Sequence, residues 1–208
     1  MSQFQQLVQA RRSANKFKMD VAISEQELHD MFSLVKFAPS AFNLQHARYV
    51  AVTDKELKDK IYEAAHKQYK VKTSSAVIAV LGDLEAYRNV GPINEGLLNL
   101  GVMDQREFDD TVNDVTRMYE EGGDSFKRDE AIRNASLSAM LFMLIAKDKG
   151  WDTCPMIGFD PERLKQALNI PDRYVPVMLI AVGKEDTEKQ RPRGYRKPVG
   201  EFASFNGL

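Results

Sequence analysis

Two runs of apolar residues constrain most strongly what this chain can fold into. Residues 76–81 read AVIAVL and are closed by Gly82, and residues 177–182 read VMLIAV. Apolar runs of this length, without alternating polar residues, are typical of strands that are buried on both faces. We therefore expect a central sheet with helices packed against both of its sides.

Other segments carry the signals of helices that could cover such a sheet. Ser24 is followed three residues later by Glu27, as in a capping box, and an apolar stripe comes next. Asp54 predicts the start of a second helix, and Asp160, with a proline directly after it, predicts a third. Residues 49–52 read as a short strand between the first two helices. Because helices and strands mix without strict alternation, the pattern favours an α+β fold.

The length of the chain and the composition of its middle part indicate how it is organised into domains. We interpret residues 1–208 as a single domain with a helical excursion at residues 84–130, where charged residues and glycines interrupt the apolar patterning. Residues 134–145 are apolar almost all round, which predicts a helix buried in the core or in a subunit interface. The tail at residues 190–208 is basic first and then apolar.

Composition and missing motifs exclude several function classes. The chain has 29 Lys and Arg against 30 Asp and Glu, so neither a nucleic-acid nor an anionic-membrane surface is expected. No dinucleotide-binding or P-loop glycine motif occurs. The three histidines lack the spacing of metal ligands, and no apolar run approaches the ~20 residues of a membrane helix. The single cysteine, Cys154, rules out an intrachain disulfide; it reads as a small buried residue or, alternatively, as a nucleophile. We expect a cytoplasmic protein without a metal site.

Three separated stretches, taken in order, resemble the FMN-binding elements of the nitroreductase family. Residues 11–17 (RRSANKF) are similar to its R-R-S-x-x-x-F element, and residues 38–45 (APSAFNLQ) to its P-S-x-x-N-x-Q loop. Residues 150–160 (GWDTCPMIGFD) are similar to its G-x-x-x-x-P-x-x-G-F-D stretch, and residues 196–198 to its closing basic element. The order of these elements across nearly the whole chain makes the resemblance specific.

The resemblance implies a fold, a cofactor and a partner. The fold would be a mixed central sheet flanked by helices, with the tail at residues 190–208 embracing the partner of a homodimer. FMN would be tightly bound at the subunit interface, with NAD(P)H as the electron donor. Hydride would pass through flavin N5 in a ping-pong scheme to nitroaromatic, quinone or similar electrophilic small molecules. This scheme requires no catalytic acid or base from the side chains.

The phosphate of FMN suggests roles for the basic residues. Guanidinium groups bind phosphate oxygens in bidentate fashion, so Arg11 and Arg196 are the candidates, with Ser13 as a hydroxyl donor. The alternative for Arg11 is a solvated cation at the C-terminal end of a helix. The complete set of candidate cofactor-binding residues is Arg11, Arg12, Ser13, Asn15, Pro39, Ser40, Asn43, Gln45, Lys67, Lys70, Pro155, Met156, Ile157, Gly158, Arg193 and Arg196.

The flavin ring needs hydrogen-bond donors near N1 and O2, where reduction places negative charge. Asn15 stands where the family has a basic residue, and Lys70, then Lys67, are the nearest basic alternatives; a solvated charge run is the competing interpretation. The resemblance implies that Ser40 and Asn43 reach the flavin of the partner, although both residue types also serve ordinary turns. Residues 155–158 would offer backbone N–H groups to N5 and O4, with Gly158 permitting close approach.

Two other functions remain open. One is a specialised flavoenzyme on the same fold, such as a reductive dehalogenase or a flavin-degrading enzyme, with residues 84–130 as a substrate lid. The other is a flavin-binding protein without turnover, which stays open because Asn15 and Ile157 replace more typical residues. Oxidation of NAD(P)H with a quinone or nitroaromatic acceptor would separate these functions from a general reductase.

Overall fold

The computed structural model describes the whole chain except Lys189, Arg191 and Leu208. Four strands form one sheet in the order β1 (Ala47–Val52), β2 (Ala76–Asp83), β4 (Tyr174–Gly183), β3 (Asp152–Met156). All three strand pairs are antiparallel. A mixed sheet was expected, but the parallel pairing in the described part of the chain is one isolated bridge, where Ser13 meets Thr153 beside the edge strand β3.

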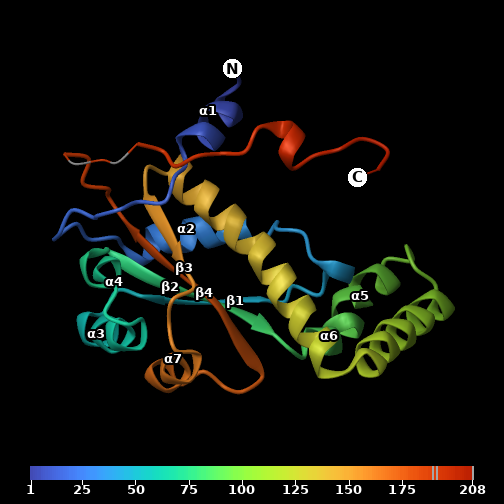
Figure 1. Cartoon of the computed structure of the whole chain (residues 1–208). Coiled ribbons are helices and arrows are strands. Elements are labelled where there is room, and N and C mark those ends of the chain that lie inside the picture. The colour runs from blue at the N-terminus through green and yellow to red at the C-terminus, as the bar shows by residue number, and fades with distance from the viewer. Residues whose placement is uncertain (189, 191, 208) are drawn as a thin grey trace.

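Two layers of helices cover the sheet, as the apolar runs predicted (Figure 1). One layer consists of α3 (Lys55–Ala64), α4 (Tyr69–Thr73) and α7 (Pro161–Leu168); the other consists of α2 (Glu25–Val35) and the C-terminal half of α6 (Gln105–Asp148). Strand β2 is buried at every residue, and its side chains alternate between the two layers: Val77 and Ala79 face the first core, and Ile78 and Val80 face the second. The expectation of an α+β fold with a doubly covered sheet is confirmed.

The helix starts follow the predicted capping chemistry. Ser24 and Glu27 form the reciprocal capping box of α2, and the side chain of Asp54 accepts the N–H of Leu57 at the start of α3. Asp160 caps α7 through two backbone N–H groups, with proline at the first helical position. The short helix α1 (Gln3–Ala10) precedes them, and no helix in the described residues is long and apolar enough to cross a membrane.

Strand β3 was not expected from the sequence. It has only five residues and contains Pro155, and proline within a run argues against a strand. An edge strand tolerates proline because one of its sides makes no ladder hydrogen bonds, and β3 lies at the edge of this sheet. Cys154 is 4% exposed in β3, in agreement with the expected small buried residue beside a strand.

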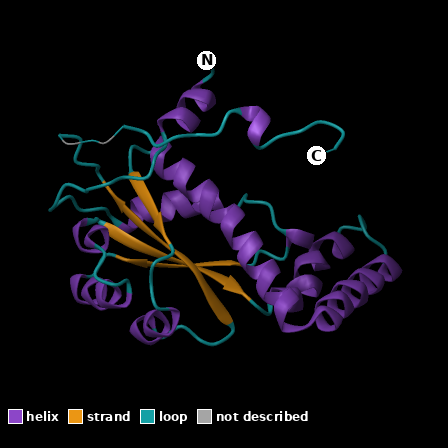
Figure 2. Cartoon of the chain, viewed as in Figure 1, coloured by secondary structure: helices purple, strands orange, loops and turns teal. Residues whose placement is uncertain are grey.

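Helix α6 continues from the excursion into the core. It is interrupted at Gly123, where φ is 68° and ψ is −168°. The N-terminal half of α6 packs with α5 (Val90–Asn99) and the 3-10 turn η2 (Ala86–Asn89) in a helical group beside the sheet (Figure 2). The buried rings of Tyr87 and Tyr119 stack within this group. The C-terminal half is buried on one side only, since Leu137 and Met140 keep 48% and 42% of their surface exposed.

The tail passes beside α1 and then extends away from the sheet (Figure 1). Its described residues from 192 onward are exposed, including Phe202 at 68% and Phe205 at 88%, and a single 3-10 turn, η3 (Val199–Glu201), interrupts it. Phe202 and Phe205 therefore offer apolar surface that a partner could cover.

Candidate functional site

The segment at residues 11–17 lies along the open edge of the sheet. Its backbone is held at Ala14, whose N–H donates to the carbonyl of Thr153 at 2.9 Å, and at Asn15, whose N–H donates to Oε1 of Glu185 at 3.0 Å. Phe17 is completely buried and anchors the far end of the segment. These contacts place Arg11 and Ser13 at the side of β3.

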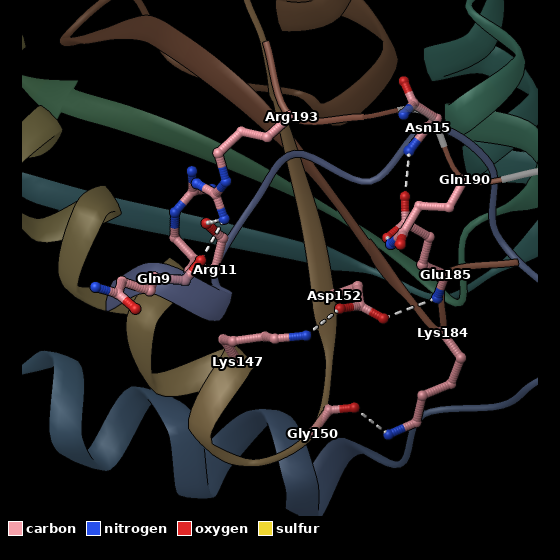
Figure 3. Close-up of polar contacts among 10 residues, drawn as sticks. All are labelled: Gln9, Arg11, Asn15, Lys147, Gly150, Asp152, Lys184, Glu185, Gln190 and Arg193. Atoms are coloured by element: carbon pink, nitrogen blue, oxygen red, sulfur yellow. Dashed lines mark hydrogen bonds and ion pairs between the residues drawn. The ribbon is translucent and has the colours of Figure 1, made fainter. Parts of the chain in front are cut away.

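Three arginines from opposite ends of the chain meet at this edge. Arg193 donates to the backbone carbonyls of Gln9 and Arg11, which fastens the tail to the end of α1 (Figure 3). The pKa of Arg11 is lowered by burial and then by the positive charges of Arg193 and Arg196, while Cys154 acts in the opposite direction. Within the described residues these three guanidinium groups form no ion pair with a carboxylate. A dianionic phosphate among them would relieve their mutual repulsion, so the donor set fits the phosphate of FMN.

Next to the three arginines, the carboxylates of Asp152 and Glu185 form a hydrogen-bond network. Lys147 of α6 pairs with Oδ1 of Asp152 at 2.8 Å, and Oδ2 of Asp152 accepts the N–H of Glu185 at 2.8 Å (Figure 3). Glu185 is 6% exposed and also accepts from Gln190 at 2.8 Å, in addition to the N–H of Asn15. The network joins the N-terminal segment, β3 and the start of the tail.

The end of β3 forms the other side of this edge. Nζ of Lys70 donates to Sγ of Cys154 at 3.1 Å, which brings the lysine next to residues 155–158. The carbonyl of Gly158 accepts from the side chain of Gln68 at 2.6 Å, and Ile157 is 83% exposed. Lys70 therefore lies where a cation could face a flavin ring placed over residues 155–158.

Three further candidates are Lys67, Asn15 and Arg12. Nζ of Lys67 is 3.7 Å from the carboxylate of Glu63, on the exposed surface of α3. The side chain of Asn15 is exposed, and it is the backbone N–H of this residue that donates to Glu185. Arg12 is half-buried at the end of α1.

The loop with Pro39, Ser40, Asn43 and Gln45 forms a second group, next to α5 and away from residues 11–17 (Figure 1). It borders a pocket of about 680 Å³, whose lining includes Phe32, Lys36, Pro39, Ser40, Gln45 and His46. Within one chain the two groups of candidates are not brought together.

The backbone of this loop has an unusual conformation. Phe42, Asn43 and Gln45 all have positive φ, at 51°, 56° and 54°. Left-handed backbone is uncommon for residues other than glycine, and for a bulky residue it marks strain that the surroundings must enforce. Strained backbone of this kind clusters at functional sites.

His46 directly follows the loop and is buried. It is 1% exposed, its Nε2 lies 3.0 Å from the hydroxyl of Tyr119 on α6, and its Nδ1 has no protein partner among the described residues. Burial lowers the pKa of His46 to about 4, against the smaller effect of Asp83. Burial also raises the pKa of Tyr119 to about 12, so both side chains are neutral at neutral pH.

We expect His46 to make the protein less stable as the pH falls below 6.5. In the unfolded chain a histidine has its ordinary pKa of 6.5, whereas the folded His46 resists protonation down to about pH 4. The unfolded state therefore binds more protons in this window, and the free energy of unfolding should fall by about 2 kcal/mol between pH 7 and pH 5. Urea unfolding of the wild type and of His46→Gln at several pH values measures this difference, because the variant lacks the contribution. Parallel stability curves for the two proteins would show that His46 does not titrate in this way.

Sequence reasoning missed Gln68, Glu185 and Asp152, which orient the candidate cofactor-binding segments. Glu185 contacts Asn15 across 170 residues of chain, and Gln68 contacts Gly158 across 90. No local pattern marks such residues, since their role depends on distant partners. Within the described residues, no group of three or more His, Cys, Asp or Glu side chains is arranged to hold a metal ion.

Comparison with known proteins finds related sequences and structures that match nearly the whole chain. The family model of the nitroreductase family matches residues 8–184. MhqN of Bacillus subtilis (strain 168), whose name assigns it to the NAD(P)H nitroreductases, is 57% identical over 205 residues, covering 99% of this chain and 100% of the relative. A crystal structure of the B. subtilis nitroreductase YdfN has a TM-score of 0.95 at 56% identity, covering 97% of this chain and 98% of that one. A nitroreductase of Exiguobacterium sibiricum 255-15, solved in complex with FMN, has a TM-score of 0.88 at 32% identity, covering 99% and 98%.

Proposed function

This chain belongs to the nitroreductase family, and we propose that it is an FMN-dependent oxidoreductase that carries electrons from NAD(P)H to nitroaromatic, quinone or similar electrophilic acceptors. The observation that carries the proposal is the group of Arg11, Arg193 and Arg196 at the edge of the sheet beside β3. The relative solved with FMN, which this chain covers over 98% of its length, supports the choice of cofactor.

The proposed cofactor contacts form two groups, one at the phosphate and one at the flavin ring. Arg11, Arg196 and Ser13 would bind the phosphate, with Arg193 holding the tail in place through the carbonyls of Gln9 and Arg11. Lys70 would supply the positive charge near N1 and O2, because it lies beside the end of β3 whereas the side chain of Asn15 carries no charge. When bound, FMN supplies the hydride chemistry, and the protein supplies orientation and electrostatics.

We propose that the functional unit is a homodimer of single-domain subunits in the cytoplasm, where NAD(P)H is available. The loop at residues 39–45 would complete the flavin site of the partner, because within one chain it lies apart from the arginine group. The tail at residues 190–208 would embrace the partner, since it leaves Phe202 and Phe205 exposed on its own subunit. The excursion at residues 84–130 would border the acceptor.

Kinetics test the proposed activity directly. NAD(P)H and the acceptor would bind the same face in turn, so initial-rate plots at several acceptor concentrations should give parallel lines. Menadione and nitrofurazone are suitable acceptors, and the absorption spectrum of the purified protein reports bound flavin beforehand. Intersecting lines would show that donor and acceptor are bound together, which contradicts the shared site. Bound flavin without any oxidation of NAD(P)H would support a flavin-binding protein without turnover.

A further inference from the structure

Asn134 is a buried polar residue of α6 and is not among the residues proposed to contact the flavin. It is 4% exposed, and its side-chain oxygen accepts the backbone N–H of Ala41 at 2.8 Å. Its amide nitrogen donates to the backbone carbonyl of Glu130 at 2.8 Å and to the carboxylate of Glu130 at 3.2 Å. The partners are an N–H on one side and two acceptors on the other, so they determine which end of the amide faces the loop.

Glu130 is in turn held in place. It is 7% exposed and is paired with Arg133 one turn further along the same helix. Its carboxylate can only accept hydrogen bonds, which keeps the amide nitrogen of Asn134 directed toward it and the amide oxygen directed toward the loop. The orientation of Asn134 is therefore set within α6 and does not depend on the loop that it contacts.

The loop needs such an external contact. Ala41 opens the 3-10 turn η1 (Ala41–Asn43), and the side chain of the preceding Ser40 makes no capping bond to that turn. The hydroxyl of Ser40 instead accepts the N–H of Gln45 at 3.0 Å, across the base of the loop. Asn134 thus supplies the cap that Ser40 does not, at the start of a segment in which positive φ recurs at Phe42, Asn43 and Gln45.

The other end of the loop is attached to the same helix. His46 lies next to Gln45 and contacts Tyr119 at 3.0 Å, in the half of α6 that precedes the break at Gly123. Asn134 belongs to the half that follows this break. Helix α6 therefore holds both ends of the loop, one from each side of the break, and it can keep the loop in a conformation that isolated residues of this type disfavour.

We propose that Asn134 is a positioning residue for cofactor binding: through the N–H of Ala41 it holds the loop at residues 40–45 in its observed conformation, so that Ser40 and Asn43 are set to meet the flavin of the partner. This inference rests on the proposed function of the loop. In this proposal Asn134 acts through the loop and not by contact with the cofactor. Removing its contact lets the loop relax, and the ordering of the loop must then be supplied by flavin binding, which weakens the apparent affinity.

The variant Asn134→Leu removes the contact while keeping similar volume, and Ser138→Ala is the matched control. Ser138 is 5% exposed on the same helix one turn further, and its hydroxyl accepts from Tyr49 of β1 at 2.6 Å, not from the loop. Asn134→Leu deletes the hydrogen bond to Ala41 and the two to Glu130, and Ser138→Ala deletes the one to Tyr49, so both remove buried hydrogen bonds of α6 but only Asn134→Leu affects the loop. For the holoprotein we expect Asn134→Leu to raise the FMN dissociation constant about tenfold, and Ser138→Ala to change it less than about twofold.

Amide hydrogen exchange supplies a readout independent of flavin and of activity. In Asn134→Leu the amides of residues 41–45 should exchange faster than in the wild type, whereas Ser138→Ala should leave them protected. If Asn134→Leu and Ser138→Ala retain FMN equally well, the positioning role is overturned while the flavin site stands. If the wild-type protein binds no FMN, the proposed function fails and this inference fails with it.

A double variant keeps the inference testable where Asn134→Leu does not fold. In Asn134→Asp combined with Glu130→Gln, the new carboxylate can accept the N–H of Ala41 and a side-chain N–H from position 130, whereas the hydrogen bond to the backbone carbonyl of residue 130 is lost. We expect its FMN affinity to lie between those of Asn134→Leu and the wild type, because the contact with Ala41 is kept. Asn134→Asp alone, which places two carboxylates side by side, should bind FMN more weakly than the double variant. Equal affinity of the two would contradict a role for this contact.

Discussion

Replacing Arg11 and Arg196 together by alanine should weaken FMN binding at least about a hundredfold. Each guanidinium would make a charge-assisted contact with the phosphate, worth about 1.5–3 kcal/mol, which corresponds to roughly ten- to hundredfold in affinity. Arg11 contributes from a half-buried position at the end of α1, where its pKa is already lowered by burial and by the neighbouring arginines. An anion bound there would therefore interact with a group that water screens only in part.

Fluorescence of free flavin during dilution of the holoprotein measures this loss. The single variants Arg11→Ala and Arg196→Ala should each lie between the wild type and the double variant. Arg106→Ala is the control for net charge, since its side chain is 90% exposed in the excursion and pairs with Asp110. If the double variant retained FMN as well as Arg106→Ala does, the phosphate would not lie at this edge.

Removing residues 190–208 should abolish both flavin retention and the dimer. The deletion takes away Arg193 and Arg196 together with the exposed rings of Phe202 and Phe205. An obligate interface typically buries more than about 2,000 Å², and such proteins need not have a stable folded monomer. The loss of flavin should therefore exceed that of Arg196→Ala alone.

Sedimentation with absorbance read at the flavin band tests this prediction on the full-length protein. The variant Phe202→Ser with Phe205→Ser separates the two effects, because it keeps the arginines and removes only apolar contact area. We expect it to dissociate at higher protein concentration than the wild type and to release flavin as it does so. A full-length monomer of 23.6 kDa with a full complement of FMN would show that one subunit builds the site alone.

Local chemistry made a large part of this fold predictable from the sequence. The two apolar runs became β2 and β4, and the caps at Ser24, Asp54 and Asp160 start helices where the sequence predicted them. These features depend on side chains within a few residues of one another, through hydrogen bonds to nearby backbone N–H groups and the burial of continuous apolar segments. The short polar and basic motifs likewise identified the segments that border the candidate site.

Tertiary structure alone decided how those segments come together. It formed β3 around Pro155, broke α6 at Gly123, and brought Arg193 to the carbonyl of Arg11 across 182 residues of chain. It also separated Lys67 from Lys70, although the two lie in one charge run, because one faces Glu63 on α3 and the other reaches Cys154. The physical reason is the distance along the chain over which each interaction acts. Caps and apolar runs act over a few residues, whereas an edge strand, a break in a helix and a cluster of arginines each depend on packing between segments that are distant in the chain.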